Sequence, residues 1–285
     1  MTGMRTRKTL KRNNDNNSDN KNGYGGKTLF VVGVGPGDPE LITIKAVNAI
    51  IKSDFIFYPD VCGGRNKTAY DIIKTAIKFA GLSDIPENKL IPLKVEMKRS
   101  TGKNKDLYRG NALKIYEKLS ENGCSYASYV TLGDPVFYST YSGLYASLQK
   151  IIEAKDADNE SININIINGV SSFLYSFGLI GEPYISKNAS VLISVPVKKD
   201  LEEIKDEIKF VAKKSESYGP QLIVFMKAGG YVKDILKAFE ELFPKETENE
   251  NIKLYLIEKS VLVKDFMKKM DLNFDYFSIL IGAFL

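Results

Sequence analysis

A glycine- and proline-rich segment near the start of the chain has the residue types of a small-molecule site. The segment GVGPGDPELITIKA spans residues 33–46 and follows an apolar run at 28–32. Its glycines allow a ligand to approach the main chain, and Pro36 and Pro39 hold the same loop ready for binding. A strand, a rigid glycine loop and a helix in this order build ligand sites in α/β proteins. The segment therefore indicates a binding loop, with a tight turn that binds nothing as the open alternative.

The loop departs from the usual dinucleotide fingerprint. A third glycine would fall at position 38, where the chain has Asp38, whose carboxylate would repel a pyrophosphate. Asp54 nevertheless lies about twenty residues after the first glycine, where a ribose-binding acid would stand. A nucleotide-dependent oxidoreductase is therefore kept as an alternative from a different class of enzyme, to be decided by nicotinamide binding.

Two further segments carry polar groups directly after apolar runs. TLGDPVFYSTY covers residues 131–141, and its Asp134 can accept hydrogen bonds from a ligand amine or hydroxyl, or else cap the following helix. NGVSSFLYSFG covers residues 168–178 and supplies two adjacent serines. Main-chain groups at such strand ends are free to bind a polar cofactor.

These three segments resemble, in order and spacing, the motifs of the tetrapyrrole methylases. The YST after GDP, together with GVSSF, is most similar to the branch that methylates C20 of precorrin-2. The resemblance covers roughly residue 28 to the C-terminus and implies an S-adenosylmethionine-dependent methyltransferase of cobalamin biosynthesis, a homodimer with the cofactor in the cleft between two domains. The residues that it places against the cofactor are Pro36, Leu132, Gly133, Asp134, Phe137, Ser171, Ser172 and, on weaker grounds, Met226.

The implied reaction moves a methyl group from a sulfonium to an electron-rich ring carbon. Because the methyl is already activated, the protein chiefly has to align the reactants and exclude water. The chain has no histidine, which is compatible with that need and excludes Ser-His catalysis and histidine metal sites. No metal site is expected, and no general base can be identified from the sequence.

The tetrapyrrole substrate carries several carboxylates, so its site should contain fixed cations. Outside the basic tail there are three arginines, and arginine suits bidentate carboxylate binding. The substrate-side candidates are therefore Arg65, Arg99 and Arg109, together with Asp38, for which a turn-capping role is an equal alternative.

Other functions stay open beside this one. Within the family they are a methylase acting at a different ring carbon, and the diphthine synthases. GEPYIS at 181–186 lacks the TH pair of uroporphyrinogen III methylases, and YST argues mildly against diphthine synthase. A non-enzymatic tetrapyrrole or nucleic-acid binder would depend on the basic tail.

The bulk properties are those of a globular protein with room for two domains. The chain has 285 residues, of which 44% are hydrophobic and 26% charged. Residues 1–27 hold seven Lys/Arg and two Asp, so they account for the whole net charge of +5. This Asn-rich tail is predicted to be disordered, without a nucleic-acid or membrane partner. No apolar run is long enough to cross a bilayer, and two cysteines fit a reducing cytoplasm.

Alternating strand and helix patterns predict two tandem α/β domains at 28–158 and 162–285, joined by a polar linker at 153–161. The strand at 162–166 is assigned to the second domain. The stretch EKSVL after Ile257 matches no motif. Periodicity predicts strands at 28–32, 55–58, 127–132, 162–166, 191–195, 222–226, 254–257 and 277–284, and helices at 40–51, 68–79, 105–119, 139–152, 201–213 and 232–242.

Overall fold

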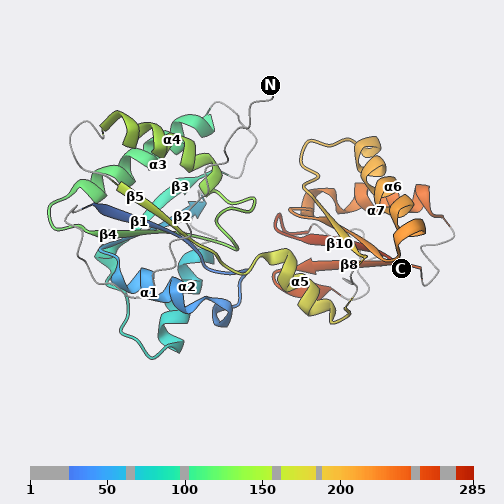
Figure 1. Ribbon diagram of the computed structural model, residues 1–285, viewed down its shortest axis with the longest axis horizontal. Coiled ribbons are helices and arrows are strands. Elements are labelled where there is room, and N and C mark those ends of the chain that lie inside the picture. The colour runs from blue at the N-terminus through green and yellow to red at the C-terminus, as the bar shows by residue number, and fades with distance from the viewer. Residues whose placement is uncertain are drawn as a thin grey trace, which may run out of the picture.

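Two α/β lobes lie side by side and are joined through one segment of chain (Figure 1). Each lobe contains a five-stranded sheet. A computed structural model describes residues 26–61, 68–96, 103–155, 162–183, 188–244, 251–263 and 274–285. None of the helices in these ranges is long and apolar enough to span a membrane.

The first sheet is entirely parallel and has the strand order β3-β2-β4-β1-β5. Parallel strands place all their carboxyl ends at one edge of the sheet, where α/β proteins bind ligands. Its strands are β1 (Lys27–Gly33), β2 (Phe55–Val61), β3 (Leu90–Val95), β4 (Tyr126–Thr131) and β5 (Ile162–Ile167).

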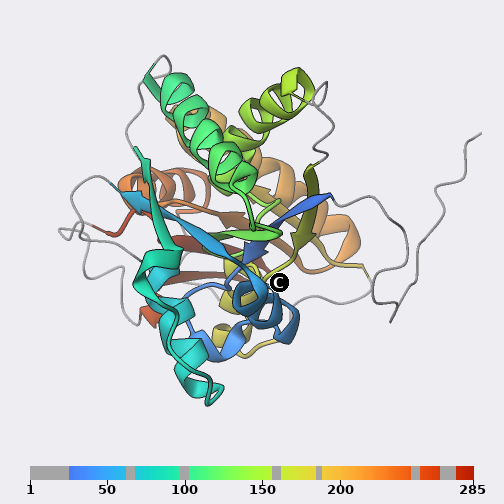
Figure 2. The same cartoon turned by 90° about the vertical axis from the view of Figure 1, so that its left-hand side faces the viewer.

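Helices cover both faces of this sheet, as Figure 2 shows in a view from the first lobe's side. One buried cluster joins α1 and α2 to one face through residues such as Ile50 and Ile73, and another joins α3 and α4 to the other through Ile115 and Leu148. Strands buried on both faces are nearly continuous apolar runs, as Val31 and Val32 illustrate. The helices are α1 (Ile44–Lys52), α2 (Thr68–Phe79), α3 (Lys103–Ser120) and α4 (Tyr141–Lys155).

The second sheet is mixed and has the order β6-β7-β10-β8-β9. β6 and β7 are parallel, whereas β10 runs antiparallel to both of its neighbours and β8 forms a hairpin with β9. The six residues of β10 are all buried, which confirms that the apolar run near residue 285 is a buried strand. The strands are β6 (Ser190–Ser194), β7 (Gln221–Phe225), β8 (Ile252–Glu258), β9 (Val261–Val263) and β10 (Ile279–Phe284).

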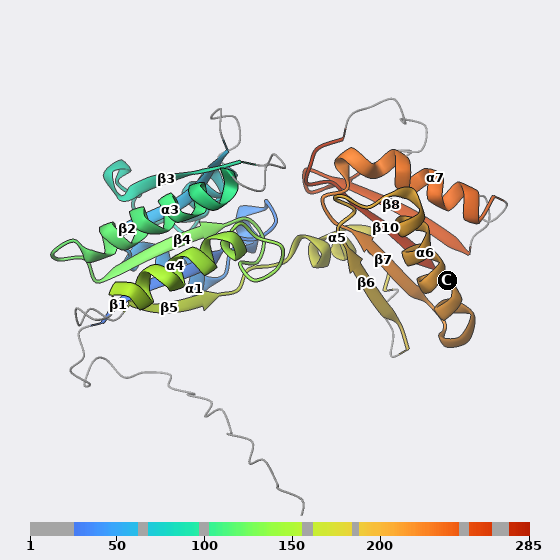
Figure 3. The ribbon, with the colours of Figure 1, turned by 90° about the horizontal axis from the view of Figure 1, so that it is seen from above.

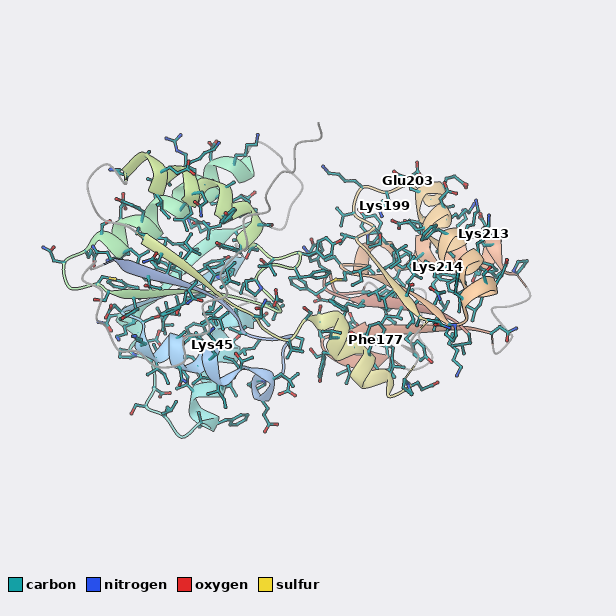
Figure 4. The ribbon with its side chains drawn as sticks, viewed as in Figure 1. Lys45, Phe177, Lys199, Glu203, Lys213 and Lys214 are labelled. Carbon is teal, nitrogen blue, oxygen red and sulfur yellow. The ribbon has the colours of Figure 1, made fainter. Side chains whose placement is uncertain are left out.

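Within the described residues of the second lobe, three α-helices pack on its sheet. α6 (Leu201–Tyr218) and α7 (Val232–Leu242) cover one face through a common buried cluster. α5 (Ser172–Ile180) covers the other face, where Phe177 is labelled in Figure 4. Its partly buried aromatic residues pack with Phe137, which belongs to the first lobe. α5 thus lies at the junction of the two lobes, as the view from above in Figure 3 also shows.

The boundary between the lobes differs from the prediction by one strand. The segment at 162–166 was assigned to the second domain, but β5 pairs in parallel with β1 along its whole length. β5 is an edge strand of the first sheet, so the chain leaves that sheet after Ile167 and not within the polar stretch at 153–161. The first three residues of that stretch end α4, and 156–161 lie outside the described residues. The tail at 1–25 also lies outside them.

The predicted fold class, two tandem α/β domains, is confirmed. Among the α-helices and strands of the described residues, three were not predicted: β3, α5 and β9. β3 contains Pro92, which lacks an N–H donor, yet an edge strand tolerates proline because it pairs on one side only.

Candidate functional site

The three glycine-containing segments meet at the carboxyl ends of β1, β4 and β5. Gly35 and Gly133 form a two-way backbone bridge, with N···O distances of 3.2 and 2.7 Å. The N–H of Val34 also donates to the carbonyl of Thr131 at 3.0 Å. Segments about a hundred residues apart in the sequence are therefore joined into one loop layer.

Two positions at this junction require glycine because there is no room for a side chain. A Cβ on Gly33 would stand 2.6 Å from the carbonyl oxygen of Gly133 and 2.6 Å from the nitrogen of Gly169. A Cβ on Gly169 would stand 2.3 Å from the same carbonyl oxygen. All the obstructing atoms are backbone atoms, so no side-chain movement could relieve the clash. The close approach of three strand ends depends on these residues.

The carboxylate of Asp134 holds the loop layer together by accepting three hydrogen bonds. It is buried, and one carboxylate oxygen accepts a hydrogen bond from the N–H of Val136 at 2.9 Å. The other accepts from the side-chain amide of Asn168 at 2.9 Å and from the N–H of Gly169 at 3.2 Å. A buried carboxylate needs such donors. Asp134 therefore does not cap the following helix, which begins at Tyr141, but joins the second loop to the third.

A cavity of about 690 Å³ opens beside this layer, between the two lobes. This volume lies within the usual range for small-molecule sites, about 300–1,000 Å³. The structure brings all eight predicted cofactor residues to its wall: Pro36, Leu132, Gly133, Asp134, Phe137, Ser171, Ser172 and Met226.

The second lobe supplies the opposite wall through the hairpin turn between β8 and β9. Lys259 and Ser260 form this turn with φ angles of 49° and 63°, and the hydroxyl of Ser260 donates to the carbonyl of Pro36 at 3.2 Å. The turn belongs to the EKSVL stretch that no motif explained. Its sequence lacks the Gly or Asn that usually marks a turn with positive φ, so the hairpin could not be recognised.

Backbone strain gathers around the same cavity. Five non-glycine residues have positive φ in the part of the chain that the structure describes. Four of them line the cavity, and they are Tyr138, Lys227, Lys259 and Ser260. Such conformations cost free energy and tend to persist at functional sites. Lys227 was not predicted, although it follows Met226 directly, because a lysine after a buried strand gives no distinct sequence signal.

The first turn of α5 also reaches the cavity. Ser171 is its N-cap residue, but its hydroxyl does not cap the helix. The leading N–H groups of a helix have no partner within it and carry a partial positive charge. Together with the Ser171 and Ser172 hydroxyls they provide hydrogen-bond donors at the wall. Phe137 adds an apolar surface, with its ring centroid 5.1 Å from that of Phe173 on α5.

Of the four residues predicted to bind the substrate, the structure describes two, and only one of these lines the cavity. Asp38 lines the cavity, while its carboxylate accepts from the N–H of Glu40 at 2.9 Å and so caps a short 3₁₀ helix. Arg109 lies exposed on α3 and is not among the residues that line the cavity. Arg65 and Arg99 lie outside the described residues.

Asp54 does not occupy the position of a ribose-binding acid. It precedes β2, at the edge of the sheet opposite to the cavity, and accepts from the N–H groups of Ser125 and Tyr126 at 2.9 and 3.1 Å. Burial alone would raise the pKa of Asp54, but these two donors bring it below its usual value. Asp54, the residue that favoured a nucleotide-dependent oxidoreductase, therefore stabilises the start of β4 and does not line the cavity.

Residues 28–249 match the family of Tetrapyrrole (Corrin/Porphyrin) Methylases, and the chain belongs to that family. It is a methyltransferase, as the sequence predicted. A probable cobalt-precorrin-2 C(20)-methyltransferase of Methanocaldococcus jannaschii is 29% identical over 212 residues, which are 74% of this chain and 82% of the relative. A precorrin-2 C(20)-methyltransferase of a Sinorhizobium species is 27% identical over 168 residues, 57% of this chain and 62% of the relative.

Solved structures share the fold. The uroporphyrin-III C-methyltransferase of Thermus thermophilus, in complex with S-adenosylhomocysteine, superposes with a TM-score of 0.54. The alignment covers 90% of this chain and 92% of that chain at 15% sequence identity. At this identity the likeness shows the two-lobed fold alone.

Proposed function

We propose that the protein transfers a methyl group from S-adenosylmethionine to C20 of precorrin-2 or of its cobalt complex. The observation that carries the proposal is the convergence of three family motifs on one inter-lobe cavity. The choice of carbon rests on two relatives, which are named as C20-methyltransferases of cobalt-precorrin-2 and of precorrin-2.

The residues at the cavity fit an S-adenosyl cofactor. Gly133 has a φ of 69°, and no atom lies within 4 Å of the position that a Cβ would take there. A ligand can therefore approach the main chain of this loop closely. Ser171 and Ser172 offer hydroxyls for the polar groups of the ligand, and Phe137 and Met226 offer apolar surface for a base or a thioether.

Bound S-adenosylmethionine would supply a methyl group already activated by a positive sulfur. The chain's own residues then have to orient and desolvate the reactants. Pro36 and the bridged Gly35 give the first loop a fixed shape. The side-chain amide of Asn168 and the N–H of Gly169 donate to Asp134 and so hold the third loop against the second. Rigid loops lose little entropy on binding, so they favour a single reactive arrangement.

The substrate side of the proposal names Asp38, Arg65, Arg99 and Arg109. Asp38 borders the cavity, which is compatible with a contact to the tetrapyrrole. Arg109 is the weakest of the four, because it lies exposed on α3 away from the cavity lining. By family resemblance we also propose a homodimer, which sedimentation would test, and a cytoplasmic location.

Calorimetric titration with S-adenosylhomocysteine tests the cofactor, with NADH as the control ligand. We expect S-adenosylhomocysteine alone to bind. Incubation with S-adenosylmethionine and either precorrin-2 or its cobalt form, followed by carbon NMR of the product, then locates the new methyl. A new methyl at another carbon would show that the protein belongs to a different branch of the family. A folded sample that binds no S-adenosylhomocysteine would refute the proposal.

A further inference from the structure

One lysine is held half-buried in the wall of the cavity. Lys227 follows β7, and its ammonium donates to the carbonyl oxygen of Tyr138 in the other lobe at 3.0 Å. The same nitrogen lies 5.9 Å from the ring centroid of Tyr276. No carboxylate within the described ranges forms an ion pair with it. An ammonium has three N–H donors, so two of them remain for another partner.

This placement is costly for a lysine. Burial lowers the pKa of Lys227, because the charged form loses water that no acid replaces. Its φ of 57° adds backbone strain that a lysine in extended conformation would not have. Lys259 lines the same cavity but is exposed, and its charge is therefore hydrated. An anion bound beside Lys227 would offset the desolvation.

The surroundings favour a carboxylate over a phosphate. The lining includes three acids, Asp38, Asp134 and Asp275, against two lysines. A doubly charged phosphate would meet more repulsion in this field than a singly charged carboxylate. Both proposed ligands carry carboxylates: the amino-acid end of the S-adenosyl cofactor, and the acidic side chains of the tetrapyrrole.

We propose that Lys227 is a carboxylate-binding residue of the cavity, pairing with an acid of the cofactor or of the tetrapyrrole. This inference rests on the proposed function. Lys227 then contributes one charge-assisted hydrogen bond to the ligand while it keeps its bond to Tyr138.

The test compares three probes on one set of variants by calorimetry. S-adenosylhomocysteine carries the cofactor's carboxylate, methylthioadenosine lacks the amino-acid end, and uroporphyrin is a stable tetrapyrrole polyacid. Lys227→Met keeps an unbranched side chain, one heavy atom shorter, and the same backbone strain but removes the charge, whereas Lys227→Arg retains the charge. Lys233→Met removes an exposed lysine from α7 and serves as the matched control. Circular dichroism melts check that each variant is folded.

Two outcomes support the proposal. Lys227→Met weakens S-adenosylhomocysteine about 10- to 100-fold and methylthioadenosine less than about twofold if the acid belongs to the cofactor. It weakens uroporphyrin by a similar factor and spares S-adenosylhomocysteine if the acid belongs to the tetrapyrrole. In either case Lys227→Arg recovers most of the affinity, and Lys233→Met changes nothing.

Other outcomes overturn it. Equal losses for S-adenosylhomocysteine and methylthioadenosine would mean that Lys227 only positions the loop at Tyr138. Unchanged affinity for all three probes would mean that the ammonium binds no ligand. Failure of the unaltered protein to bind any probe would instead refute the proposed function, so the two failures are distinguishable.

Discussion

At the scale of single residues, the glycine junction decides whether the site can exist. Three chain segments approach one another there with no room for a Cβ at Gly33 or Gly169. Gly33 was predicted, with the other glycines of the first loop, to let a ligand approach the main chain, whereas Gly169 was noted only as part of the third motif. The structure gives Gly33 and Gly169 a different task, since they let three strand ends pack, while Gly133 has open space above it.

Gly169→Ala is expected to destabilise the protein by about 2–3 kcal/mol, because the added methyl meets only backbone atoms. Gly110→Ala is the control, since Gly110 lies in α3 with no atom within 4 Å of its Cβ position. That change should stabilise the protein by about 0.5–1 kcal/mol. Urea unfolding measures both. Equal effects of the two changes would contradict the packing argument.

Asp54 gives the protein a stability contribution that depends on pH. Its folded-state pKa is depressed, so the contribution is present above the unfolded pKa near 3.8 and is lost as the pH falls through the folded value. Asp54→Asn keeps an acceptor oxygen and removes the charge. We expect a loss of about 1 kcal/mol in unfolding free energy at pH 7, since the group is partly exposed.

Unfolding in urea at pH 7 and again near pH 3 measures this difference. It should shrink at the lower pH, because the unaltered carboxyl is then becoming protonated as well. A loss of the same size at both pH values would show that the charge of Asp54 is not what its two backbone donors stabilise.

At the scale of elements, the sequence predicted long periodic segments well and short or irregular ones poorly. α2 and α7 begin and end at the predicted residues. β3 was not predicted because it contains a proline, which argues against a strand. β9 was not predicted because it has only three residues and the turn before it contains no Gly or Asn. α5 was seen only as a motif, since its apolar residues lack the regular spacing of a one-sided helix.

The assignment of β5 failed for a different reason. Alternation of isoleucine and asparagine predicted a half-buried strand correctly, but it carries no information about which sheet the strand joins. The polar stretch before it was interpreted as a linker, whereas it connects a helix and a strand of one lobe. Pairing partners are set by packing across the whole lobe, and a local pattern cannot reveal them.

The capping box of α6 offers a prediction at this scale. The carboxylate of Asp200 accepts from the N–H of Glu203 at 2.9 Å, and Glu203 accepts from the N–H of Asp200 at 2.8 Å. Figure 4 labels Glu203 in the first turn of this helix and Lys214 about one turn before its end at Tyr218. Asp200→Ala should cost about 1 kcal/mol, measured by thermal unfolding.

Glu216→Ala is the matched change at the opposite end of α6. Glu216 is exposed in the last turn, where a negative charge is unfavourable, so its removal should stabilise slightly. Destabilisation of similar size by both changes would contradict the capping argument.

At the scale of the whole molecule, the cavity lies between two lobes that share few hydrogen bonds in the described ranges. Ser260 bonds to Pro36 and Lys227 bonds to Tyr138, and both pairs lie at the cavity wall. A ligand that fills the cavity contacts both lobes and should therefore couple their unfolding.

S-adenosylhomocysteine at about 100 times its dissociation constant should stabilise the protein by about 2.7 kcal/mol. We expect the thermal midpoint to rise by several degrees and any separate transitions of the two lobes to merge. Differential scanning calorimetry with and without the ligand measures this, and NADH should leave the trace unchanged. A shift in the transition of one lobe alone would place the ligand outside the inter-lobe cavity.

The position of β10 bears on how the protein is made. β10 is the last strand of its sheet along the chain, yet it lies in the middle, between β7 and β8. The first sheet uses only strands before residue 168, so it can be completed during synthesis while the second remains unfinished. Until Ile279–Phe284 emerge from the ribosome, β7 and β8 each expose an unpaired apolar edge. We therefore expect the nascent second lobe to expose apolar strand edges after the first sheet is already complete.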